Sequence, residues 1–246
     1  ACVARMGKFE LEMGGKNPMV MLDDANLDVA VSAAINSGFF STGQRCTASS
    51  RLIVTEGIHD RFVSAMVEVM RTLKVDDARK TGTDIGPVVD EKQLAQDLEY
   101  IRSAQSEGAK LMAGGDVLGK NTQSAPGWYL RTALFTKTTS GMRINREEIF
   151  GPVMSVLRAK NYDEALALAN GSEFGLAAGI ATTSLKHATH FKRNAQAGMV
   201  MVNLPTAGLD YHVPFGGRKA SSYGPREQGR YACEFYTTVK TAYTKA

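Results

Sequence analysis

Short apolar runs alternate with longer amphipathic segments along most of this 246-residue chain. The apolar runs predict strands at 18–22, 51–55, 110–113, 128–135, 153–159, 177–182 and 199–203. The amphipathic segments between them predict helices at 27–40, 58–73, 91–107, 163–170 and 185–195. Because such apolar strands need cover on both faces, the alternation indicates an α/β fold with a mostly parallel sheet.

Polar and glycine-containing stretches at 76–89, 114–127 and 221–229 interrupt the alternation and are typical of surface loops. The run from 233 to 245 is rich in aromatic and β-branched residues, which favours a strand with no obvious partner inside the chain. Such a strand can dock on another subunit or fold back on its own sheet, and the sequence leaves both open.

Composition limits the classes of function. The hydrophobic fraction of 43% and the charged fraction of 22% are ordinary for a soluble globular protein. The net charge is +4, but Lys and Arg are scattered rather than gathered in blocks with aromatic residues, so we expect no nucleic-acid partner. No apolar run approaches the roughly 20 residues that span a bilayer, so we expect no membrane contact and a cytoplasmic location.

The number and spacing of the cysteines and histidines argue against disulfides and structural metal sites. Cys2, Cys46 and Cys233 are odd in number and widely spaced, which argues against a disulfide framework and favours reduced thiols. The four histidines do not lie at ligand spacing with acids or thiols, so no metal site is predicted. No Gly-x-Gly-x-x-Gly sequence follows a predicted strand, so a complete dinucleotide site is not indicated either.

Two residues are candidates for covalent chemistry. Cys46 lies in a glycine-broken segment between a predicted helix and a β-branched run, where a turn can present a thiol to a substrate. Glu12 leads directly into Gly14 and Gly15, and a carboxylate in a pocket that excludes water has its pKa raised toward the range of a general base. A packed thiol and a solvated acid are the alternative interpretations.

Four ordered segments together resemble the signatures of the aldehyde dehydrogenase superfamily. Leu-Glu-Met-Gly-Gly-Lys at 11–16 and Gly-Gln-Arg-Cys at 43–46 are similar to its general-base and nucleophile motifs. Arg-Glu-Glu-Ile-Phe-Gly-Pro-Val at 146–153 resembles its nicotinamide-ribose segment, and Pro-Phe-Gly-Gly-Arg-Lys at 214–219 resembles its late substrate-side loop. The resemblance implies a three-layer αβα catalytic domain with a mostly parallel sheet.

The resemblance also implies a reaction and a set of roles. The Cys46 thiolate would attack an aldehyde, the adduct would give hydride to NAD or NADP, and Glu12 would activate the water that hydrolyses the thioester. The Cys46 backbone N–H is a candidate oxyanion donor.

Further residues would take binding roles on the same resemblance. Glu148 would bind the nicotinamide ribose and Phe150 would pack beside the ring, while Met13 and Gly14 would line the approach. Phe215 would face the aldehyde. An exposed acid and packing aromatics are the alternatives for Glu148, Phe150 and Phe215.

The resemblance further suggests a domain division. We expect residues 1–13 to be the end of a dinucleotide-binding domain, 14–230 to be the catalytic domain and 231–246 to be an oligomerisation strand of a homo-oligomer, a dimer or tetramer. Most of the N-terminal cofactor domain would precede this chain, so we expect the chain alone to be inactive in hydride transfer. The segments 203–214 and 221–229 resemble enzymes that oxidise 2-oxoglutarate semialdehyde, also called 2,5-dioxopentanoate.

Two other functions stay open. A CoA-acylating semialdehyde dehydrogenase would use the thiol of Cys46 but would need no hydrolytic base, which Glu12 argues against. The chain could also be an inert structural or interaction piece that lacks a complete cofactor site.

Overall fold

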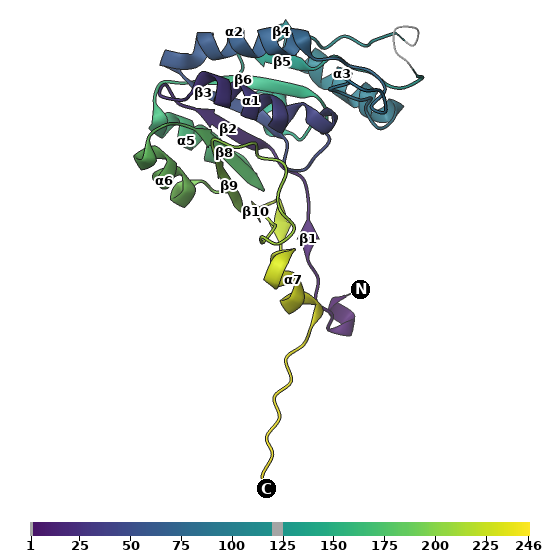
Figure 1. Ribbon diagram of the computed structural model, residues 1–246, viewed down its shortest axis with the longest axis vertical. Helices are drawn as coiled ribbons and strands as arrows, with labels where there is room; N and C mark the ends of the chain where they lie inside the picture. The colour runs from purple at the N-terminus through teal and green to yellow at the C-terminus, as the bar shows by residue number, and fades with distance from the viewer. Residues whose placement is uncertain (1, 120–124) are drawn as a thin grey trace.

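A computed structural model describes residues 2–119 and 125–246, and its centre is a seven-stranded sheet (Figure 1). The strand order is β4-β5-β6-β3-β2-β8-β9, and every pair is parallel except β4 with β5 at one edge. The strands are β2 (Asn17–Met21), β3 (Ser49–Thr55), β4 (Lys110–Ala113), β5 (Ala133–Thr136), β6 (Val153–Ala159), β8 (Ala177–Ala181) and β9 (Met199–Val202). The central strands β2 and β8 are buried at every residue, as a sheet covered on both faces requires.

Helices cover the two faces of this sheet and make three layers. Met19 and Met21 of β2 face the core shared with α1 (Leu27–Gly38) and α2 (Glu56–Thr72). Val20 points the other way, into the core formed with α5 (Tyr162–Asn170) and α6 (Leu185–Asn194). The helix α3 (Glu91–Ser106) covers β5 through a third apolar cluster.

Short elements extend the fold beyond this body (Figure 1). Two small antiparallel sheets pair β1 (Leu11–Glu12) with β11 (Ser222–Tyr223) and β7 (Phe174–Gly175) with β10 (Arg218–Lys219). The remaining elements are η1 (Val3–Arg5), η2 (Phe40–Gly43), α4 (Arg143–Arg146) and α7 (Gly229–Tyr236). The pairing of β1 with β11 matters most, because it joins residues 210 positions apart at Glu12 and Ser222.

The predicted helices and the strands of the main sheet are confirmed, although β5 begins five residues later than predicted, but the start of the predicted C-terminal strand is wrong. Gly229–Tyr236 is a helix, and 237–246 has no regular secondary structure. An Arg230–Glu234 ion pair of 3.0 Å stabilises this helix, and the Lys8 ammonium donates to carbonyl oxygens at its C-terminal end. The predicted loop at 114–127 lies partly outside the described residues.

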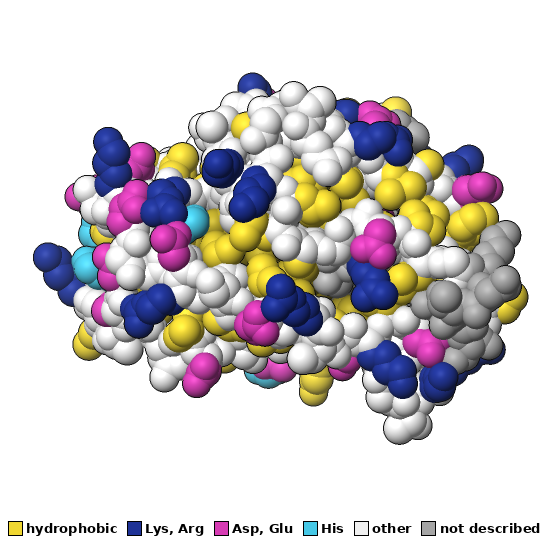
Figure 2. Space-filling model, turned by 90° about the horizontal axis from the view of Figure 1, so that it is seen from above, with side chains coloured by type: hydrophobic (Ala, Val, Ile, Leu, Met, Phe, Trp, Pro, Cys, Tyr) yellow, Lys and Arg dark blue, Asp and Glu magenta, His cyan; other side chains and the backbone are white. Residues whose placement is uncertain are grey.

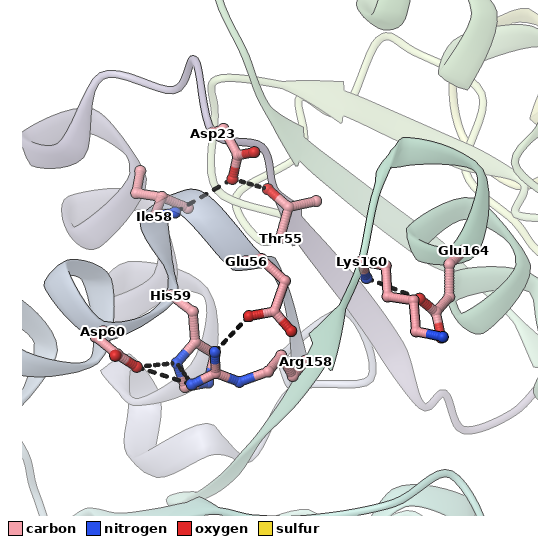
Figure 3. A network of polar contacts seen from close by, with 9 residues as sticks. All are labelled: Asp23, Thr55, Glu56, Ile58, His59, Asp60, Arg158, Lys160 and Glu164. Carbon is pink, nitrogen blue, oxygen red and sulfur yellow. Dashed lines mark hydrogen bonds and ion pairs between the residues drawn. The ribbon is translucent and has the colours of Figure 1, made fainter.

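The carboxyl ends of β3 and β6 are filled by polar side chains. The chain leaves β3 toward α2 and β6 toward α5, on opposite faces, and ligands of open α/β sheets often bind at such a point. Here Arg158 spans the gap and donates to Glu56 (2.5 Å) and Asp60 (2.8 Å), and it also contacts His59 Nδ1 (2.7 Å) (Figure 3).

Asp23, which follows the neighbouring strand β2, also has hydrogen-bond partners within the chain. Its carboxylate accepts hydrogen bonds from Thr55 Oγ1 (2.6 Å) and from the Ile58 backbone N–H (3.2 Å) (Figure 3). The polar side chains at the carboxyl ends of these strands are therefore paired with one another. The candidate catalytic residues lie at the opposite, amino-terminal ends of the same strands.

The surface charge and the helices of the described residues were the features to compare with the expected absence of nucleic-acid, membrane and metal binding. Basic and acidic side chains are interspersed on the face seen in Figure 2, with hydrophobic side chains between them. Across residues 2–119 and 125–246, no helix is both long and apolar enough to cross a bilayer. Within the same ranges, no three His, Cys, Asp or Glu side chains come together in a group that could hold a metal ion.

Candidate active site

The candidate residues gather at the amino-terminal ends of three adjacent parallel strands. Cys46 precedes β3, Glu148 precedes β6, and Glu12 and the Gly14–Gly15 turn precede β2. Because β6, β3 and β2 are neighbours that run in the same direction, the segments before them meet at one edge of the sheet. Sheet order thus brings together motifs that are far apart in the sequence.

The glycine turn holds the Glu148 carboxylate at close range. The Gly15 N–H donates to Glu148 Oε1 at 2.9 Å. A Cβ at Gly14 would lie 1.9 Å from Glu148 Oε2, and one at Gly15 would lie 2.8 Å from the Cys46 carbonyl oxygen. Only glycine allows the turn to fit between the carboxylate and the cysteine backbone.

Asn17, the first residue of β2, fixes the cysteine loop. Its buried side chain donates from Nδ2 to the carbonyl oxygens of Cys46 and Ala48, both at 2.8 Å. Its Oδ1 accepts from the Ala177 N–H at 2.9 Å. One side chain therefore ties the Cys46 loop to β2 and β8 by three hydrogen bonds, one buried and two partly buried.

Thr206, which is fully buried, holds the same loop from the other side. Its hydroxyl donates to the Thr47 carbonyl oxygen at 2.7 Å and is 2.9 Å from Ser49 Oγ. Its N–H donates to Ser37 Oγ at 3.0 Å. The residues on both sides of Cys46 are thereby anchored to the body of the domain.

The Cys46 thiol is half-buried and is protonated at rest. It packs with Phe215 and Leu209 against a small apolar cluster of Leu176, Ala177, Met199 and Met201. Burial raises the pKa of Cys46, and the charges of Glu148 and Glu12 raise it further, whereas the N–H groups of Thr47 and Cys46 oppose the rise. Those N–H groups stabilise negative charge at this position, which is what an oxyanion donor must do.

Arg45 does not activate the neighbouring thiol. Its guanidinium donates to the carbonyl oxygens of Asn36 and Ser37 near the C-terminal end of α1. Arg45 is absent from the charges that shift the pKa of Cys46. Its role in the structure is to stabilise the end of that helix.

Glu12 is positioned by the β1–β11 pairing. Its Oε2 accepts from Ser222 Oγ at 2.9 Å, while its Oε1 is buried without a hydrogen-bond partner. Burial raises the pKa of Glu12, the Ser222 hydrogen bond lowers it, and the charge of Glu227 raises it again. A carboxylate with one oxygen held and the other free, and with a raised pKa, has the properties of a general base.

Two more acids adjoin Glu12. Glu10 lies on the same face of the β1 segment, two residues away, and has a buried Oε1 without a partner. Burial raises the pKa of Glu10 to about 7, aided by a hydrogen bond with Glu227 and by its charge. Glu10 therefore adds a second carboxyl group with a raised pKa next to Glu12.

Met13 and Phe150 lie at the surface of the site. Met13 and Phe150 expose 42% and 39% of their area, which leaves both side chains open to a bound molecule. Phe150 and Glu148 line a narrow recess together with Gly15 and the 43–50 segment. Phe150 also has a positive φ of 60°, which is uncommon for an aromatic residue and is frequent at ligand-contacting positions.

Comparison with known proteins decides the family. The model of the aldehyde dehydrogenase family matches residues 1–242. The chain belongs to the aldehyde dehydrogenase family. This confirms the resemblance in the four motifs.

The similarity extends over nearly the whole of this chain. It is 42% identical over 245 residues to the alpha-ketoglutaric semialdehyde dehydrogenase of Bacillus subtilis, covering 100% of this chain and 50% of that protein. It is 42% identical over 241 residues to the 2,5-dioxopentanoate dehydrogenase of Saccharolobus solfataricus, covering 97% of this chain and 49% of that protein. The chain spans about half the length of the curated relatives it matches.

A solved structure confirms the fold of this aldehyde dehydrogenase domain. The NAD+ complex of the aldehyde dehydrogenase from Bacillus cereus aligns with a TM-score of 0.91 at 35% identity. The alignment covers 97% of this chain and 47% of the Bacillus cereus chain. The three-layer αβα architecture expected from the motifs is therefore present.

Four residues that hold the site, Lys16, Asn17, Thr206 and Ser222, were not predicted from the sequence. Asn17 and Lys16 stand within the glycine motif, and Ser222 stands in a segment used only to suggest a subgroup. Their positions before β2 and on β11 gave no signal of function. Asn17 could have been suspected, because an amide at the start of an apolar strand needs hydrogen-bond partners once buried.

Proposed function

We propose that this chain carries the catalytic chemistry of an NAD(P)-dependent aldehyde dehydrogenase, with Cys46 as nucleophile and Glu12 as general base. The observation that supports this most directly is the convergence of Cys46, Glu12 and Glu148 around the Gly14–Gly15 turn. The Bacillus subtilis and Saccharolobus solfataricus relatives are named for the oxidation of a semialdehyde, which supports the same reaction class.

The first step is attack of the Cys46 thiolate on an aldehyde carbon. A carbon–sulfur bond forms, and the carbonyl oxygen becomes an oxyanion beside the backbone N–H groups of Cys46 and Thr47. Because burial and the charges of two carboxylates raise the pKa of the Cys46 thiol, formation of the thiolate needs a nearby group that accepts its proton. Glu12 and Glu148 are the nearby acceptors.

The residues before β6 fit a nicotinamide coenzyme. Glu148 offers a half-buried carboxylate suited to ribose hydroxyls, and Phe150 offers an exposed ring beside it. Met13 and Gly14 would line the approach from the other side. When bound, the coenzyme would accept the hydride that converts the cysteine adduct to a thioester.

Hydrolysis of the thioester returns the enzyme to its starting state. Glu12 takes a proton from water, the hydroxide adds to the thioester carbon, and the carbon–sulfur bond breaks with the Cys46 thiolate as the leaving group. The thiolate takes up the proton that the product acid loses, and Glu12 releases its proton to solvent. The unpartnered Glu12 Oε1 is the atom proposed to receive the proton. A CoA-acylating enzyme would need no such base.

For the substrate we propose 2-oxoglutarate semialdehyde, with Phe215 facing the aldehyde. Phe215 packs in the same apolar cluster as Cys46. For the segment 231–246 we propose a role in subunit contact, now as a helix followed by an extended tail rather than as a strand.

The proposal is tested with an ester that needs no coenzyme. p-Nitrophenyl acetate acylates a reactive thiol, so wild type should release a burst of p-nitrophenol followed by slow turnover. Cys46→Ala should abolish the burst, while Glu12→Gln should keep the burst and slow turnover about 100-fold or more. Cys233→Ala, which removes an exposed thiol on α7, is the matched control and should behave as wild type.

Reduction of NAD and NADP with 2-oxoglutarate semialdehyde then tests the complete reaction, in a protein that joins this chain to a dinucleotide-binding domain, because the chain alone is expected to be inactive in hydride transfer. Hydride transfer with either coenzyme supports the dehydrogenase. An unchanged burst in Cys46→Ala would show that another group is acylated and would overturn the assignment of the nucleophile.

A further inference from the structure

A cavity of about 450 Å³ lies between α2 and the β4 edge of the sheet, and none of the proposed catalytic steps uses it. Small-molecule sites are typically cavities of about 300–1,000 Å³. This cavity lies at the carboxyl ends of β5 and β6, whereas the candidate catalytic residues precede β2, β3 and β6. Figure 1 shows α2 and β4 on the side of the sheet away from both chain termini. The cavity is therefore separate from the candidate active site.

Strand pairing brings the lining residues to one face of the sheet. Thr136 on β5 is the register partner of Lys110 on β4, so their side chains point to the same face. Arg158 follows Val156 by two residues on β6 and shares its face. Val156 packs in the core that α1 and α2 cover, and Met112 of β4 packs against the same core. The strands β4, β5 and β6 thus form the floor of the cavity, and α2 forms a wall.

The floor of the cavity is mainly apolar. Val63, Met112 and Val156 line it, and both valines are buried among their neighbours. Figure 2 looks onto this side of the molecule and shows hydrophobic side chains at the surface with Lys and Arg side chains around them. Such a floor favours a ligand with an apolar part, because the contact removes apolar surface from water.

Two lysines at the rim carry charge that the chain itself does not use. Lys110 and Lys137 line the cavity and are exposed. Across residues 2–119 and 125–246, neither ammonium has an ion pair or a hydrogen bond. Lys137 has a positive φ of 55°, so the chain turns directly after β5. Thr136, Lys137 and Thr138 therefore all line the cavity, although successive residues of a regular strand point to opposite faces.

The acids near the cavity are already paired with an arginine. Glu56 Oε2 and Asp60 Oδ1 both accept hydrogen bonds from the guanidinium of Arg158 (Figure 3). These contacts are ion pairs, so the charge of Arg158 is balanced within the chain. The ammonium groups of Lys110 and Lys137 are therefore the cations that a ligand can use.

His59 places a hydrogen-bond donor in the wall of the cavity, although only 7% of its surface is exposed. Its Nδ1 lies 2.7 Å from Arg158 Nη2 and 2.7 Å from Asp60 Oδ1. A guanidinium can only donate, so Nδ1 accepts from Arg158 and the ring proton lies on Nε2. A cationic ring that donates from Nδ1 to Asp60 also carries a proton on Nε2. Within the described ranges Nε2 has no partner and is not sealed from solvent, so it can donate to a ligand.

We propose that this cavity is a binding site for a small organic anion of the phosphate monoester class. The phosphate group would contact Lys110, Lys137 and the Nε2–H of His59. The esterified apolar group would lie against Val63 and Met112. A phosphate monoester carries close to two negative charges near neutral pH, which match two ammonium groups. The site does not depend on the proposed dehydrogenase chemistry.

Binding of phenyl phosphate to the chain, followed by NMR, tests this proposal. The ¹³C-methyl signal of Met112 should shift and reach saturation. Inorganic phosphate lacks the apolar part and benzyl alcohol lacks the charge, so each should bind at least about tenfold more weakly. Equal binding of either compound, or no saturable shift of Met112, would overturn the proposal. A shift of the Gly15 N–H signal alone would place the ligand at the candidate active site and would overturn it as well.

Substitution of the two lysines tests the contact with the phosphate group. The double variant Lys110→Met/Lys137→Met should bind phenyl phosphate at least about tenfold more weakly, and added salt should weaken binding to wild type. Lys92→Met is the matched control and should keep the wild-type affinity, because Lys92 is an exposed lysine on α3 outside the cavity. Unchanged affinity in the double variant would show that the ligand binds elsewhere. None of these measurements uses Cys46 or a coenzyme, so failure here is distinct from failure of the dehydrogenase assay.

Discussion

Asn17→Ala should loosen the Cys46 loop at a large cost in stability. The substitution leaves three backbone groups without their partner: the partly buried carbonyl oxygens of Cys46 and Ala48 and the buried N–H of Ala177. Each such group costs about 1–3 kcal/mol when it is left unsatisfied. Because water can enter part of the vacated space, we expect a loss of about 3–5 kcal/mol rather than the full sum.

Urea unfolding followed by circular dichroism measures this loss. Asn194→Ala is the matched control, since Asn194 is exposed and its amide makes one hydrogen bond, to His190 O at 2.8 Å. The control should change the free energy of unfolding by less than about 0.5 kcal/mol. Alkylation of Cys46 by iodoacetamide should also become faster in Asn17→Ala, because burial is the main cause of the raised pKa of the thiol.

A loss below about 1 kcal/mol in Asn17→Ala would refute this reasoning. It would mean that water replaces all three hydrogen bonds, so that Asn17 does not hold the loop. A large loss with unchanged alkylation of Cys46 would separate the two effects, and Asn17 would then support the sheet alone.

Three further predictions concern ionisable groups. Glu148→Gln removes a charge that raises the pKa of Cys46, so the pH midpoint of the Cys46 alkylation rate should move to lower pH. An unchanged pH profile would show that the charge of Glu148 does not act on Cys46. Ser222→Ala removes a hydrogen bond that lowers the pKa of Glu12, so the acid limb of the deacylation rate should move to higher pH. Burial raises the pKa of Asp97 to about 7 from about 4 when unfolded, so its proton stabilises the fold at low pH and stability falls as pH rises from about 4 to 7. Asp97→Asn should remove up to about 1.4 kcal/mol per pH unit of that slope in urea titrations, whereas an unchanged slope would assign it to other groups.

The fold was predictable where local pattern and tertiary burial agree. The run 153–159 is apolar, has strand length, and is the strand β6 with the same bounds. The segment 233–245 has equally strong strand propensity, yet Cys233 to Tyr236 are helical. Its helix is stabilised by Lys8, whose contact from 226 to 229 positions away no local pattern encodes.

The site was predictable as far as motifs reach. Cys46 and Glu12 were singled out from neighbouring residues, and burial raises the pKa of both groups in the structure. Thr206 and Ser222 were missed, because their contacts with the Cys46 loop and with Glu12 join residues 159 and 210 positions apart. Such contacts follow from sheet order and from the β1–β11 pairing, which the sequence pattern does not specify.

The electrostatics of the site lower the reactivity of the Cys46 thiol when no ligand is bound. Burial and the charges of Glu148 and Glu12 raise the pKa of Cys46, so the thiolate is disfavoured. A positively charged nicotinamide ring near Glu148 and Phe150 would reverse this balance, because opposite charge stabilises the thiolate. Under the proposed function, coenzyme binding would therefore favour formation of the thiolate, and without coenzyme the thiol would be less open to alkylation and oxidation.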